Sequence, residues 1–214
     1  MSTEIRRIMS QQDRDEGSRI LATSFMKLNR LWYNVLPNYE DACQVYYIKL
    51  ALSMGQGMAY GFYLDGKLIG VKTNFPLEYY LSIPKKPSKI KIFNLLNTYS
   101  TEIEKSIPYH EAGEAAFGTL LAMAPEYGSK GYSMELALEA MKTMQQSGYK
   151  VWYGWVSNPV SRFMCQKLGG EELSEVKMTE TEVKGGLLVL IKIDLTKKLP
   201  RLDDLRKSFI SPRL

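Results

Sequence analysis

The sequence predicts a mixed α/β fold, in which helices cover a central sheet. Helix-like and strand-like apolar patterns follow one another along the chain. Ala115–Met123 is an uncharged run of strand length, which is typical of a buried central strand. Upstream, Asp65-Gly66 separates two apolar runs and predicts a tight hairpin. The 214 residues are 45% hydrophobic, which suits one globular domain, placed here at 1–195 with an insertion at about 75–113 and a tail at 196–214.

The N-terminal half contains a short strand, two helices and the hairpin. Residues 4–9 alternate between polar and apolar and predict a strand. Apolar residues at helical spacing predict helices at 12–28 and 41–54, and glycines end the second one. The hairpin strands are expected at 58–64 and 67–74. Prolines interrupt 75–113, where a helix at 89–106 is expected within a substrate-side insertion.

The C-terminal half alternates between strands and helices. After Ala115–Met123 comes a helix with an apolar side at 131–147, closed by a glycine. A Val- and Trp-rich strand follows at 150–157. Pro159 opens a short helix at 159–168, because proline is tolerated at the first helical position. The last strands are expected at 171–180 and 187–195, and the polar tail is expected to be partly disordered.

Composition restricts the classes of function. The net charge of +5 and the pI of about 9.0 suit a polyanionic ligand, either a phosphate-rich cofactor or a nucleic acid. Basic residues form no long tract, so we expect no nucleic-acid partner. Two cysteines, Cys43 and Cys165, and one histidine, His110, predict neither a disulfide framework nor a metal site. With no signal peptide or membrane span expected, we predict a soluble, cytoplasmic monomer or homodimer that does not bind membranes.

The segment from Leu120 to Ser133 joins the central strand to a helix and carries the clearest functional signal. Gly128 and Gly131 allow a tight turn. The N–H groups of such a turn, together with a helix N-terminus, favour the binding of a pyrophosphate, and Lys130 adds a positive charge. An ordinary strand-to-helix turn with glycines remains the alternative.

The stretch MAPEYGSKGYSMELALEAM resembles the acyl-CoA-binding motif of the GNAT superfamily of N-acetyltransferases. In that motif a strand is followed by Pro, two residues, and Arg/Gln-x-x-Gly-x-Gly/Ala before a helix. Pro125 and Gly131 match it. Gly128 replaces the Arg/Gln, and Ser133 replaces the last small residue.

A second stretch, VSNPVSRFMCQKLGGEE, resembles the family's next motif. Asn158 matches the Asn that follows the strand in this motif, and Lys167-Leu168-Gly169 match its ending. Gly170 stands in place of the usual Phe. Cys165 stands where many members have the Tyr that acts as general acid. The resemblance covers roughly 5–195 and extends loosely to arylalkylamine-type members.

The resemblance implies a GNAT-type fold and the transfer of an acetyl group from acetyl-CoA directly to a primary amine, without a metal. The pantetheine arm would lie between the fourth and fifth strands and pair with the fourth. The residues implied in cofactor binding are Leu121, Ala122, Met123, Gly128, Ser129, Lys130, Gly131, Tyr132, Ser133, Asn158 and Ser161. A backbone N–H near Met123 would stabilise the oxygen charge.

The reaction needs a base for the amine and a proton for the leaving thiolate. Glu114 is the first choice of base, with His110 and Glu111 behind it. A solvated carboxylate and a surface histidine are the alternative interpretations. By alignment Cys165 is the candidate acid, with Tyr153 or Ser161 as substitutes, and a buried inert thiol is the alternative.

The acceptor is expected to be a small-molecule amine. Aromatic residues could line its pocket or simply pack in the core; they lie at Trp32-Tyr33, Tyr46-Tyr47, Tyr79-Tyr80 and Trp152–Trp155. Three other functions remain open. These are acetylation of a protein or peptide amine, binding of acyl-CoA without turnover, and nucleic-acid binding, which predicts steep salt dependence.

Overall fold

The computed structural model describes residues 2–28, 38–85, 91–179 and 186–209. The described strands form one seven-stranded sheet in the order β1-β2-β3-β4-β5-β7-β6. Trp32-Tyr33 lies outside the described residues. The strands are β1 (Thr3–Arg7), β2 (Ala59–Leu64), β3 (Lys67–Pro76), β4 (Ala115–Met123), β5 (Val151–Val156), β6 (Glu171–Lys177) and β7 (Leu187–Asp194). The predicted mixed α/β fold is confirmed.

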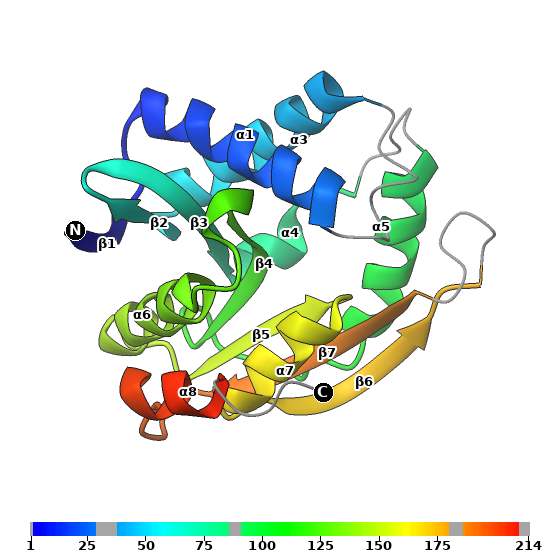
Figure 1. Ribbon diagram of the computed structural model, residues 1–214. Coiled ribbons are helices and arrows are strands. Elements are labelled where there is room, and N and C mark those ends of the chain that lie inside the picture. The colour runs from blue at the N-terminus through cyan, green and yellow to red at the C-terminus, as the bar shows by residue number, and fades with distance from the viewer. Residues whose placement is uncertain (1, 29–37, 86–90, 180–185, 210–214) are drawn as a thin grey trace.

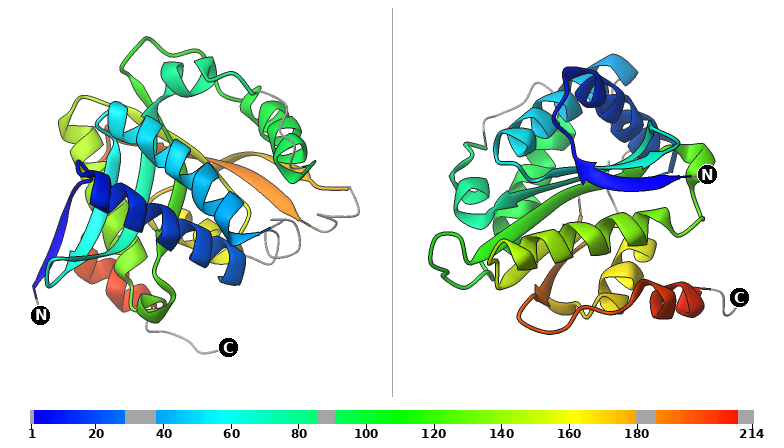
Figure 2. Two further views of the ribbon diagram at one scale, coloured as in Figure 1. Left: turned by 90° about the horizontal axis from the view of Figure 1, so that it is seen from above. Right: turned by 90° about the vertical axis from the view of Figure 1, so that its left-hand side faces the viewer.

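Helices cover both faces of the sheet, as Figure 1 and the right-hand view of Figure 2 show. The cores on the two sides are built from different helices. One face carries α1 (Gln11–Leu28), α3 (Tyr39–Gly55), α4 (Leu77–Ser82) and α5 (Lys91–Glu104). The other carries α6 (Tyr132–Gln146), α7 (Pro159–Lys167) and α8 (Leu202–Phe209). No helix in the described ranges combines the length and the apolar character that crossing a bilayer requires.

Local sequence signals explain most element boundaries. Asp65 and Gly66 both have positive φ, 49° and 81°, as a type I′ hairpin turn requires. The Asn38 side chain accepts a hydrogen bond from the Asp41 N–H at 2.8 Å and so caps α3. Pro159 occupies the first turn of α7, as predicted.

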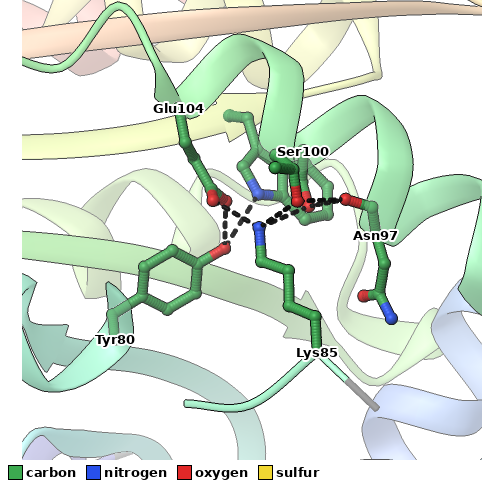
Figure 3. A network of polar contacts seen from close by, with 7 residues as sticks. Tyr80, Lys85, Asn97, Ser100 and Glu104 are labelled. Atoms are coloured by element: carbon green, nitrogen blue, oxygen red, sulfur yellow. Dashed lines mark hydrogen bonds and ion pairs between the residues drawn. The ribbon is translucent and has the colours of Figure 1, made fainter. Parts of the chain in front are cut away.

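The insertion folds into two helices, α4 and α5, of which only α5 was predicted. A buried polar network joins them: the Tyr80 hydroxyl donates to Glu104 at 2.6 Å, and Lys85 forms an ion pair with the same carboxylate. Figure 3 shows both side chains directed at Glu104. Lys85 also donates to Ser100 at 3.2 Å. Because a buried carboxylate is costly without partners, this network fixes α5 against α4.

The C-terminal tail contains a helix that the sequence analysis did not predict. Residues 202–209 form α8, and Leu205 is buried against the core beneath α6. Arg206 donates to Glu135 of α6 at 2.8 Å. The sequence analysis did not predict this helix, which forms because its apolar side is buried on folding.

Candidate functional site

The sheet opens between β4 and β5. These two strands pair in parallel only from Ala115↔Val151 to Gly118↔Gly154. Beyond that point β4 runs on to Met123 and β5 to Val156. On the edge that faces β5, residues 119–123 have no strand partner in the described part of the chain. Backbone N–H and C=O groups left unpaired in this way need other partners, and a ligand with amide groups can supply them.

A cavity of about 250 Å³ fills this opening. Its wall includes residues from both faces of the sheet, Ser24 and Phe25 of α1 on one side and Cys165 of α7 on the other. The gap therefore connects the two faces, and two molecules could meet within it from opposite sides. The remaining lining residues are Lys72, Gly118, Thr119, Leu120, Leu121, Ala122, Met123, Gly128, Ser133, Trp152, Trp155, Val156, Ser157, Asn158, Val160, Ser161 and Met164.

The turn between β4 and α6 closes one end of the cavity. Gly128 and Ser133 line the cavity. Ser129 and Gly131 both have left-handed backbone, with φ of 61° and 79°, and this conformation is costly for the serine. No side chain caps the N-terminus of α6 at Gly131. Free N–H groups and the helix dipole make this end of the cavity suitable for an anion such as a phosphate.

Two other residues of the turn contact aromatic rings. Lys130 Nζ lies 5.3 Å from the ring centroid of Tyr127. The Tyr132 ring packs against Phe62, with centroids 4.9 Å apart. Neither residue lines the cavity itself, although both flank its phosphate-suited end.

The corner between β5 and α7 forms a second wall. The Asn158 side chain accepts a hydrogen bond from the Val160 N–H at 2.8 Å and caps α7. Asn158 and Ser161 both line the cavity. Asn158 therefore lies at the opening between the strands, and its side-chain carbonyl oxygen is already used to cap α7.

Trp152 lines the cavity where the paired part of β4 and β5 ends. Gly118 and Gly154 face each other across the strand pair, and a Cβ on either would come closer than 3.0 Å to the indole. The indole can therefore lie flat over these two strands. Its Nε1 donates to Asn74 of β3 at 3.1 Å, and Lys72 Nζ lies 4.9 Å from its ring centroid. This cluster, consisting of Lys72, Trp152 and Gly118, is called the inner end below.

Two predicted catalytic residues do not reach the cavity. Glu114 precedes β4 and forms an ion pair with Lys150. The hydrogen bond from Lys150 holds the pKa of the Glu114 carboxyl below its usual value. Gly118 is the first β4 residue in the lining and lies four positions along the chain from Glu114, or about 13 Å in an extended strand. The Tyr153 hydroxyl forms a hydrogen bond with His110 Nε2 at 2.8 Å, and neither residue lines the cavity. Burial raises the pKa of Tyr153. The structure thus does not bring Glu114, His110 or Tyr153 to the opening.

Cys165 does line the cavity, together with a lysine that the sequence analysis missed. Burial raises the pKa of the Cys165 thiol to about 11, and the Lys72 charge acts in the opposite direction. Burial lowers the pKa of Lys72 to about 8, with a small opposing effect of Cys165. The sequence could have drawn attention to Lys72, because it is the one charged residue between Leu68 and Pro76. The strand around it is buried.

The wall on the α1 face combines predicted and unpredicted residues, since Trp155 was a candidate for the acceptor pocket and Ser24 and Phe25 were not. Ser24, Phe25 and Trp155 bound that side, and the Trp155 Nε1 donates to Tyr80 at 3.5 Å. Helical spacing predicted the helix that contains Phe25 but could not place it at the cavity beside Trp155. Among the residues that line the cavity there is no carboxylate or histidine. In the described part of the chain no three His, Cys, Asp or Glu residues are grouped as a metal site.

The comparisons with known proteins agree with this architecture. No protein-family model matches the chain, and no curated protein matches it in sequence. Solved structures do match. The C-terminal condensation domain of Ebony, in complex with beta-alanyl-dopamine, aligns with a TM-score of 0.74 at 10% identity over 91% of this chain and 99% of that one.

Two further structures are acetyltransferases by name. Arylalkylamine N-acetyltransferase 2 from Aedes aegypti has a TM-score of 0.67 at 15% identity, with 91% of this chain and 100% of that chain covered. The yncA protein from Salmonella typhimurium, whose structure includes its cofactor acetyl-CoA, has a TM-score of 0.59 at 10% identity, with 91% and 95% covered. The sheet order, the opening between β4 and β5 and these neighbours together show that the chain has the GNAT acetyltransferase fold.

Proposed function

We propose that this protein is an N-acetyltransferase that transfers the acetyl group of acetyl-CoA directly to the primary amine of a small molecule. The observation that carries the proposal is the cavity in the β4–β5 opening, which has the uncapped Gly128–Ser133 turn at one end. The turn suits the pyrophosphate, and the unpaired edge of β4 suits the amide groups of the pantetheine arm. This arrangement would leave the thioester at the inner end.

The α1 face supports a small amine as acceptor. Phe25 and Trp155 border the cavity from that side, and aromatic rings contact both the apolar and the cationic parts of an amine. The neighbours point the same way, since one is an arylalkylamine N-acetyltransferase and another is bound to beta-alanyl-dopamine. Positioning of the amine against the thioester is the main contribution we expect from these walls.

Calorimetric titration with acetyl-CoA tests the proposal. We expect binding by the wild type and its loss in Gly131→Glu, because a carboxylate at the start of α6 repels the pyrophosphate. Gly113→Glu is the matched control. Both glycines have open space around them and nearly equal φ, 79° and 81°, so both variants carry the same backbone strain. Gly113 lies before β4, at the end of the strand opposite to the turn.

Retained binding in Gly113→Glu with loss in Gly131→Glu would place the cofactor on the turn. A panel of aromatic and aliphatic primary amines, assayed by release of the coenzyme A thiol, would then identify the acceptor class. Absence of acetyl-CoA binding by the wild-type protein would refute the proposal and leave only the fold.

A further inference from the structure

A buried lysine faces the cavity and has no use in the fold. Lys72 is 5% exposed. In the described residues its Nζ forms no ion pair and no hydrogen bond; it lies over the face of Trp152 and near the Cys165 thiol. An unpaired buried ammonium costs stability, because desolvation penalises the charged form. A position that packing alone determined would be better filled by an apolar side chain, so Lys72 requires a functional explanation.

The surroundings of Lys72 place it where bond breaking would occur. Its strand neighbour across β3 and β4 is Leu121, in the segment that faces the opening. The Lys72 ammonium lies over the Trp152 ring at the inner end of the cavity, and the Cys165 side chain of α7 lies near it. With the pyrophosphate at the Gly128–Ser133 turn, the opposite end of the bound cofactor, its thioester, would lie beside Lys72.

We propose that Lys72 donates the proton to the coenzyme A sulfur as the thioester breaks. The inference rests on the proposed function. The neutral amine attacks the carbonyl carbon, a C–N bond forms, and the C–S bond breaks with its electron pair going to sulfur. The proton on Lys72 Nζ moves to that sulfur and gives the free thiol. The attacking nitrogen loses its extra proton to water, and the neutral Lys72 takes a proton back from water.

Cys165 is a poorer donor than Lys72, although it occupies the position of the family's tyrosine. Proton transfer is efficient when the donor's pKa lies near that of the acceptor and near the working pH. Lys72, with a pKa of about 8, is close to an ordinary thiol, whereas the Cys165 thiol has a pKa of about 11. On β2, Tyr60 lies across from Lys72, and burial raises the pKa of its hydroxyl while Arg7 opposes that shift. The buried side of α6 carries only methionine, leucine and alanine.

Two measurements test this assignment, and the first needs no acceptor. Coenzyme A that is isotope-labelled at the carbon beside its sulfur is titrated by NMR, free and bound to the protein. An ammonium close to the sulfur should lower the pKa of the bound thiol by about 1–3 units. Lys72→Met should abolish the shift, and Lys67→Met, at the exposed start of the same strand, should keep it.

The second measurement is the pH profile of kcat/KM with the best amine of the panel. A donor with a pKa near 8 predicts a rate that falls above that pH, and Lys72→Met should lose this descending limb and about 10²–10⁴-fold in rate. Misfolding is a poor explanation for such a loss, since methionine removes the desolvation cost, and acetyl-CoA calorimetry checks it directly.

The outcomes separate this inference from the proposed function. If wild-type protein binds coenzyme A but the thiol pKa is the same in wild type and Lys72→Met, the inference is overturned and the acetyltransferase proposal stands. A rate that rises through pH 8 and depends on Lys72 would make the lysine a base and also overturn it. A descending limb lost in Cys165→Ser but kept in Lys72→Met would assign the proton to the thiol. No binding of coenzyme A by the wild type removes both proposals.

Discussion

Replacement of Gly118 by alanine should destabilise the protein through Trp152. The added Cβ would come closer than 3.0 Å to three atoms of the indole, which is 3% exposed and hydrogen-bonded to the fully buried Asn74. The ring must shift to relieve this overlap, and the shift would weaken that hydrogen bond.

The size of the effect follows from three contributions. Overpacking costs about 1–3 kcal/mol. A buried polar group that loses its partner costs about 1–3 kcal/mol, and alanine regains about 0.5–1 kcal/mol over glycine in a strand. We expect a net loss of about 2–4 kcal/mol in the free energy of unfolding, because one movement of the ring relieves part of the strain while breaking the bond.

Urea denaturation of four variants measures this directly. Gly118→Ala and Trp152→Phe, alone and combined, form a double-mutant cycle that isolates the contact between the two positions. Gly55→Ala is the control, since a Cβ at Gly55 meets no atom within 4 Å. The reasoning fails if Gly118→Ala lies within about 0.5 kcal/mol of the wild type, or if it costs the same with Phe at 152.

Three further substitutions test other parts of the structure. Asn158→Ala removes the cap that accepts from Val160 and should cost about 0.5–2 kcal/mol in urea denaturation; an unchanged midpoint would contradict the capping role. Tyr80→Phe removes a donor to the buried Glu104 and should cost about 1–3 kcal/mol in the same assay, whereas a neutral result would show that the Glu104 network is dispensable. The folded-state pKa of Lys72 is lowered from 10.5 to about 8, so the unfolded chain holds more protons between these values and wild-type stability gains there as pH rises. Lys72→Met should therefore be more stable than the wild type by about 3 kcal/mol at neutral pH, with the difference shrinking above pH 8; a constant difference across that range would refute the shifted pKa.

Features set by neighbouring residues could be predicted from the sequence. The hairpin turn at Asp65-Gly66 and the bounds of β4 and α7 follow from local propensity, and the structure confirms them. The turn at Gly128–Ser133 is also a local feature, since a few consecutive residues determine its geometry.

Features that depend on distant residues could not be predicted. Glu114 adjoins β4 in sequence, yet the length of the strand keeps it from the opening. Lys72 stands out as a charge in a buried strand, but its meeting with Trp152 depends on the order of β3, β4 and β5 in the sheet. The short helix α4 was missed because its aromatic sequence between prolines gives no clear period, and packing of Tyr80 on Phe117 stabilises it.

The opening between β4 and β5 also limits how strongly the two parts of the sheet are joined. In the described residues, the four pairs from Ala115↔Val151 to Gly118↔Gly154 are the whole ladder between the β1–β4 half and the β5–β7–β6 half. A pantetheine arm bound in the gap would add hydrogen bonds to the edge of β4 and contacts with β5, and so link the two halves. If acetyl-CoA binds as proposed, it should stabilise the folded protein by about 2.7 kcal/mol at a hundred times its Kd.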